Sequence, residues 1–124
     1  MNSSEISVLD DNLKKINNKV KNFSEILSGL QKTEDKKKIL WKEIYENAIF
    51  DRENASILFT EAYATMDKKI DSHVLVGPTM AKYLERMCKS NEQILRLAEI
   101  ISKVESEENS INTDDVFSKI KEKD

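Results

Sequence analysis

Histidine and cysteine, which often act as catalytic base and nucleophile, occur once each in this 124-residue sequence. His73 is the one histidine, and Asp67 and Asp71 are four residues apart, a spacing that places two carboxylates on one edge of a helix. Paired carboxylates act in acid–base catalysis when their surroundings separate their pKa values. Here the two lie in a polar stretch between apolar segments, which favours solvated turn residues. We therefore expect no catalytic residue.

Ligands for a metal ion or a cofactor are equally sparse. Cys88 is the one cysteine, so the chain can form neither an internal disulfide nor a cysteine cluster for zinc. It lies on an apolar helix face, where an inert buried thiol is expected. Gly29 and Gly77 are the only glycines and are too far apart to form a phosphate-binding loop. We expect no metal site, no cofactor and no enzymatic activity.

The composition predicts an all-α fold in one domain. Two glycines and one proline provide almost no turn residues for a multi-stranded sheet, and 35% of the residues are charged. No basic start followed by an apolar run marks a signal peptide, and no uninterrupted apolar stretch approaches the ~18 residues of a membrane span. A soluble cytoplasmic protein is the expectation.

Residues 1–33 are predicted to form an amphipathic helix. Its apolar residues recur at alternating spacings of three and four, which is the a/d pattern of a coiled coil. Such a narrow row packs against one surface, either the following helices or a second copy. The pattern ends near Gly29. The row consists of Ile6, Leu9, Leu13, Ile16, Val20, Phe23, Leu27 and Leu30.

Residues 34–105 are predicted to form a long antiparallel helical hairpin. Its first helix is expected to begin near Thr33 or Asp35, because Thr33 can cap a helix and an acidic residue suits its positive end. Pro78 suits the first turn of the next helix, because its missing N–H would be unbonded there. That helix is accordingly expected from about residue 78 to about residue 105.

The second helix of the hairpin has more apolar surface than one neighbour covers, because a neighbouring helix covers only about a third of the circumference. The first helix of the hairpin covers one part, and either the amino-terminal helix or another subunit must cover the rest. The residues predicted to form an oligomer interface are Met80, Tyr83, Leu84, Met87, Asn91, Ile94, Leu97, Ala98 and Ile101.

Polar residues inside the hairpin have two interpretations each. Asn91 interrupts an apolar row, where an amide often fixes the register of packed helices; alternatively it lies at the rim of the interface. Asp51 and Arg52 are expected to make charge contacts between helices or between subunits.

Residues 106–124 are expected to comprise an acidic linker, over roughly residues 105–112, and a short helix capped by Thr113. Val116, Phe117 and Ile120 share one face of that helix. This face is predicted either to dock a partner or to fold back onto the body of the protein.

The net charge of −3 is unevenly distributed, because residues 1–38 carry eight lysines against six acidic residues. Repetition of this end around an assembly would multiply its positive field, so contact with DNA is a hypothesis. The lysines proposed for it are Lys14, Lys15, Lys19, Lys21, Lys36, Lys37 and Lys38.

The hairpin resembles a known family. Glu53–Met66 reads ENASILFTEAYATM and Gly77–Ala98 reads GPTMAKYLERMCKSNEQILRLA. Together they resemble the central region of the small terminase subunit of tailed bacteriophages, most closely the T4-like type. The shared pattern is a helix rich in small and aromatic residues, a turn, and a helix ending Ser/Thr-Asn-x-x-Ile/Leu-Leu-x-Leu. The resemblance covers roughly residues 40–104.

The resemblance implies a ring-forming, non-enzymatic regulator of viral DNA packaging in the host cytoplasm. Its hairpins would pack side by side as a homo-oligomer, and its ends would engage double-stranded viral DNA and the large ATPase–nuclease subunit. Two other interpretations stay open: a coiled-coil or helical-bundle adaptor, and a small nucleic-acid-binding regulator.

Overall fold

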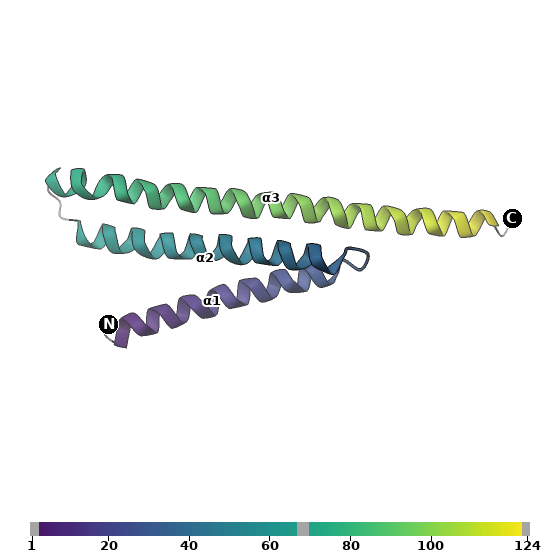
Figure 1. Cartoon of the computed structure of the whole chain (residues 1–124), viewed down its shortest axis with the longest axis horizontal. Helices are drawn as coiled ribbons and strands as arrows, with labels where there is room; N and C mark the ends of the chain where they lie inside the picture. The colour runs from purple at the N-terminus through teal and green to yellow at the C-terminus, as the bar shows by residue number, and fades with distance from the viewer. Residues whose placement is uncertain (1–2, 67–69, 123–124) are drawn as a thin grey trace.

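The computed structural model describes the backbone of residues 3–66 and 70–122, and within these ranges the side chains other than those of residues 4, 5, 111–117, 121 and 122. It contains α1 (Ser3–Ser28), α2 (Asp35–Thr65) and α3 (Ile70–Glu122). Helix α2 lies between the other two helices. Helix α3 runs antiparallel to α2 along most of the length of α2 (Figure 1). The all-α fold, with an amino-terminal helix followed by an antiparallel hairpin, is confirmed.

The core lies at the end of the bundle where α1 turns into α2. Phe23, Leu27 and Leu30 of the amino-terminal row pack here against Ile101 of α3. The Phe23 ring also stacks on the ring of Tyr45 from α2, with centroids 4.2 Å apart and planes 7° from parallel. Trp41 and Val104 complete this cluster. The second half of α1 therefore packs on the chain's own hairpin.

The first half of α1 diverges from α2 (Figure 1). Ile6, Leu9 and Leu13 belong to the same row as the core residues, yet 49%, 40% and 49% of their surfaces are exposed. Leu27 and Leu30, by contrast, are 3% and 1% exposed. The second half of this regular row is therefore buried, and its first half is exposed.

Helix α2 begins at Asp35, as expected. Thr33, however, does not cap it. The N-cap is Glu34, without a side-chain cap hydrogen bond, while the Thr33 hydroxyl donates to Glu108 Oε1 at 2.7 Å. The Lys32 N–H donates to the same oxygen at 3.1 Å. These bonds attach the α1–α2 turn to α3.

Helix α3 begins earlier than the start near Pro78 that the sequence predicted. It starts at Ile70, and Pro78 lies inside it. A proline in a helix removes one backbone hydrogen bond and disfavours the helix by about 3 kcal/mol. The carbonyl that loses its partner belongs to Val74, whose surroundings are open, since the residue is 70% exposed. Water can therefore satisfy that carbonyl.

The acidic stretch 105–112, expected to be a linker, is helical. It contains neither glycine nor proline, and glutamate is a good helix former. The expected carboxyl-terminal helix is accordingly the end of α3, a helix of 53 residues that is about 80 Å long at 1.5 Å per residue. Its last turns extend beyond the α1–α2 turn (Figure 1).

Candidate functional site

An exposed apolar row on α3 is the main candidate site of this molecule. The residues of this row begin at Ile70 and follow one another at alternating spacings of four and three, the same a/d pattern as in α1. Leu84 and Leu95 on this row are 46% and 61% exposed, and Ile70 is 80% exposed. We call the following set the outer row: Ile70, Val74, Gly77, Ala81, Leu84, Cys88, Asn91, Leu95 and Ala98.

The opposite side of α3 is occupied by the chain itself. Ser90, Leu97 and Ile101 are 1%, 4% and 5% exposed, and they lie on the side of α3 that packs against α2. Since each residue of a helix is rotated by about 100° from the last, this inner side and most of the outer row face different directions. The two meet at Asn91, which accepts a hydrogen bond from Arg52 of α2, and at Ala98, which lines the groove beside α1.

The predicted oligomer interface is therefore divided between the two surfaces. Leu97 and Ile101 were wrongly assigned to it, because both are buried within the chain's own bundle. Met80, Tyr83, Met87 and Ile94 are half-buried. Leu84, Asn91 and Ala98 are exposed and belong to the outer row. The apolar spacing of α3 does not show which of its two surfaces α2 covers, so residues of both were predicted as one interface.

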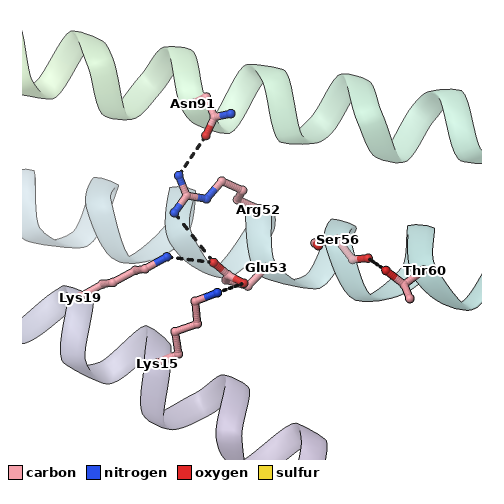
Figure 2. A network of polar contacts seen from close by, with 7 residues as sticks. All are labelled: Lys15, Lys19, Arg52, Glu53, Ser56, Thr60 and Asn91. Atoms are coloured by element: carbon pink, nitrogen blue, oxygen red, sulfur yellow. Dashed lines mark hydrogen bonds and ion pairs between the residues drawn. The ribbon is translucent and has the colours of Figure 1, made fainter.

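A carboxylate buried between α1 and α2 organises the polar contacts (Figure 2). Glu53 is 9% exposed, and Lys19 Nζ donates a hydrogen bond to its Oε1 at 3.1 Å. Lys15 Nζ and Arg52 Nη2 each lie 3.8 Å from one of its oxygens. Three cations thus surround one acid, as a buried carboxylate requires. Glu53 was not predicted from the sequence, because a glutamate among polar neighbours gives no signal of burial.

Arg52 also joins the two helices of the hairpin. Its Nη1 donates to Asn91 Oδ1 at 3.0 Å (Figure 2). The predicted inter-helix contact of Arg52 is confirmed, with Asn91 as its α3 partner. The register role of Asn91 in an assembly stays a prediction.

The lysines proposed for DNA contact are not equivalent. Lys15 and Lys19 are engaged with Glu53, and Lys36 Nζ lies 3.4 Å from a Glu34 carboxylate oxygen. Lys14, Lys21 and Lys37 are exposed and Lys38 is half-buried. They lie on two helices rather than in one cluster.

A groove of about 390 Å³ opens between α1 and α3. Its floor includes the stacked rings of Phe23 and Tyr45, and Ile94 and Ala98 contribute from α3. Burial raises the pKa of Tyr45, and the nearby Arg52 charge partly opposes that shift. Through Ala98 the groove is continuous with the outer row.

Comparison with protein-family models, curated proteins and solved structures found no match for this chain.

The residues considered for catalysis are spread over solvent-exposed positions. His73, Asp71 and Cys88 are all exposed, so the expected burial of the thiol was wrong. Asp67 lies outside the described residues. Among the side chains that the structure describes, no group of three or more from histidine, cysteine or acidic residues is placed to hold a metal ion.

Of the three tail residues proposed for docking, the structure describes the side chain of one. The side chains of Val116 and Phe117 lie outside those described, whereas Ile120 is 54% exposed. In the part of the chain that the structure describes, none of the helices is long and apolar enough to cross a membrane.

Proposed function

We propose that this protein is a non-enzymatic structural subunit that self-associates through the outer row of α3. The observation that carries the proposal is the regular a/d spacing of this row combined with its exposure. Burying a large apolar side chain contributes roughly 1.5–3 kcal/mol. Four large residues of the row are each 46–80% exposed, namely Ile70, Val74, Leu84 and Leu95. An assembly that covers them therefore gains several kcal/mol.

The specific role we propose is that of a ring-forming small terminase subunit, which regulates viral DNA packaging. The sequence resemblance over residues 40–104 supports it, and this region contains the whole outer row. An antiparallel hairpin with one face left open also suits subunits that pack side by side. Engagement of double-stranded DNA and of the large ATPase–nuclease subunit, in the host cytoplasm, is part of this proposal.

The first test is the mass of the protein in solution, measured by light scattering after size exclusion. The wild type should be one species of several subunits. Leu84→Asp combined with Leu95→Asp should give the mass of a single chain, because a buried, unpaired carboxylate costs several kcal/mol. Leu75→Asp is the matched control, since Leu75 is on α3 and 79% exposed but lies off the outer row. It should assemble like the wild type.

The mass also distinguishes the proposed role from the adaptor interpretation. A closed ring requires more than two subunits, whereas a fixed dimer with no affinity for DNA would favour a coiled-coil adaptor. A wild-type monomer would refute self-association.

DNA binding requires a separate test. Lys14→Glu with Lys21→Glu should weaken binding and flatten its dependence on salt, because both lysines are exposed. Binding that is unaffected by this change would remove α1 from the DNA-binding proposal.

A further inference from the structure

Two rows with a/d spacing keep large aliphatic side chains exposed in the described chain, although Asn91 of the α3 row bonds Arg52 and Ala98 of that row lines the groove beside α1. One is the outer row of α3. The other is the first half of the α1 row, Ile6, Leu9 and Leu13, which we call the open half of α1. The second half of that helix shows what the pattern does when covered, because it packs against the α2–α3 hairpin.

We propose that the open half of α1 from one copy packs on the outer row of α3 in a second copy. The inference rests on the proposed self-association and specifies its partner surface. Each subunit then offers two different surfaces, so the contact is heterologous and repeats from copy to copy. Such a contact forms a ring when its rotation closes.

The direction of α1 supports this exchange. Its open half diverges from its own hairpin (Figure 1), so the chain's own α2 leaves these side chains at 40–49% exposure. A helix that projects from its own bundle is positioned to reach a neighbour. In the described part of α1, both halves of the row have the same a/d spacing. They differ only in their distance from the chain's own hairpin (Figure 1).

The sizes of the side chains are complementary. The open half of α1 presents three large aliphatic residues, whereas the outer row contains small residues, such as Gly77, Ala81 and Ala98, as well as large ones. A Cβ built on Gly77 would meet no atom within 4 Å, so packing within the described chain does not require a glycine there. Small positions let knobs from a neighbouring helix enter, as in a coiled coil.

Pairing of the outer row with a second outer row is less favourable. Glu85, Glu92 and Glu99 recur at seven-residue spacing beside the row, and all three are exposed. Glu85 is paired with Lys89 Nζ at 2.9 Å, but antiparallel pairing of two such faces would still bring Glu92 and Glu99 close to the same carboxylates of the second copy, and like charges in register are destabilising. The charges beside the row thus disfavour an antiparallel pair of outer rows.

The test is a complementation experiment with two variants. The first, Leu9→Asp with Leu13→Asp, disables the open half of α1. The second, Leu84→Asp with Leu95→Asp, disables the outer row. Each variant alone should have the mass of one chain. Mixed in equal amounts, they should form a dimer of one copy of each, because each retains the surface that the other lacks.

Val8→Asp is the matched control for the first variant, because Val8 is on α1 and 54% exposed but lies off the open half. It should assemble like the wild type. Circular dichroism of each variant checks that helix content is retained.

The outcomes separate this inference from the proposed function. If the α3 variant is monomeric but the α1 variant assembles like the wild type, self-association through the outer row stands and its α1 partner is refuted. If both are monomeric and the mixture stays monomeric, the exchange between α1 and α3 is likewise refuted. If the α3 variant still assembles, the proposed function itself fails.

Cross-linking gives a second measurement that does not depend on the aspartate variants. Leu13→Cys adds one thiol to the natural Cys88, which lies exposed on the outer row. A short bifunctional maleimide should join residue 13 of one copy to Cys88 of another, and peptide mass spectrometry identifies the joined pair. Products that join only Cys88 to Cys88 would overturn the inference.

Discussion

Glu53 offers the sharpest test of how α1 is held on the hairpin. Its side chain is 11% exposed and lies among three cations, of which Lys19 is the nearest at 3.1 Å. Glu53→Gln preserves the shape of the side chain and removes its charge. Lys15, Lys19 and Arg52 would then surround a neutral amide.

The expected cost follows from the exposure of each partner. A hydrogen bond to a charged group contributes about 1.5–3 kcal/mol, but the Lys19 side chain is 31% exposed, so solvent weakens the bond. Lys15 and Arg52 lie at 3.8 Å, and a surface ion pair contributes about 0–1 kcal/mol. We therefore expect Glu53→Gln to lower the free energy of unfolding by about 2 kcal/mol. Lys15→Gln should lower it by no more than about 0.5 kcal/mol, because the Lys15 side chain is 57% exposed.

The assay is a double-mutant cycle of Glu53→Gln with Lys19→Met, followed by urea unfolding at one fixed protein concentration. The coupling energy of the pair should be about 1 kcal/mol or more. Lys15→Gln provides the control for general loss of positive charge. A cost of Glu53→Gln below about 0.5 kcal/mol, or no coupling to Lys19, would refute the reasoning, because Glu53 would then behave as a surface ion pair.

Three further predictions concern the rest of the fold. Leu27→Ala should lower the free energy of unfolding by about 2–4 kcal/mol in urea titrations, because Leu27 is 3% exposed in the core; Ile26→Ala, next to it and 51% exposed, should cost less than about 1 kcal/mol, and equal costs would contradict the assigned face of α1. Pro78→Ala should raise the thermal unfolding midpoint, because it restores a helix hydrogen bond to the Val74 carbonyl at a site inside α3; an unchanged or lower midpoint would indicate that the proline costs this helix nothing. Because burial raises the pKa of Tyr45 above its usual value of 10.0, the neutral phenol is favoured in the folded chain, and the stability it contributes is present below the unfolded pKa and is lost as pH rises through the folded one. Tyr45→Phe should therefore lose less stability than the wild type as the pH rises past about 10, measured by thermal unfolding at successive pH values, and identical losses would argue against this role of Tyr45.

The two prolonged ends of α3 show where local signals mislead. Pro78 was expected to start the helix and the acidic stretch 105–112 to interrupt it, yet α3 runs through both. A proline is compatible with helical backbone angles, and its cost is tolerable where the freed carbonyl meets water. Glu108 in turn gains hydrogen bonds from the α1–α2 turn, and that long-range contact favours helix where composition alone suggested a linker.

The candidate site was predicted only in part, for a related reason. Leu84, Asn91 and Ala98 were assigned to one predicted interface together with the buried Leu97 and Ile101, so the regular spacing that continues from Ile70 to Ala98 was not separated from the inner side of α3. The spacing itself could have been read from the sequence. Which of the two surfaces stays open could not, since that depends on where α2 packs.

The sequence by itself determined that the chain is helical, where α2 begins, and that α1 carries a row with coiled-coil spacing. These properties follow from composition and periodicity, which act over a few neighbouring residues. Only the tertiary structure decided that one half of the α1 row is buried, that Glu53 is enclosed by cations and that the outer row of α3 stays open. Each of these depends on the angle at which one helix crosses another, and that angle is set by packing between residues far apart in the sequence.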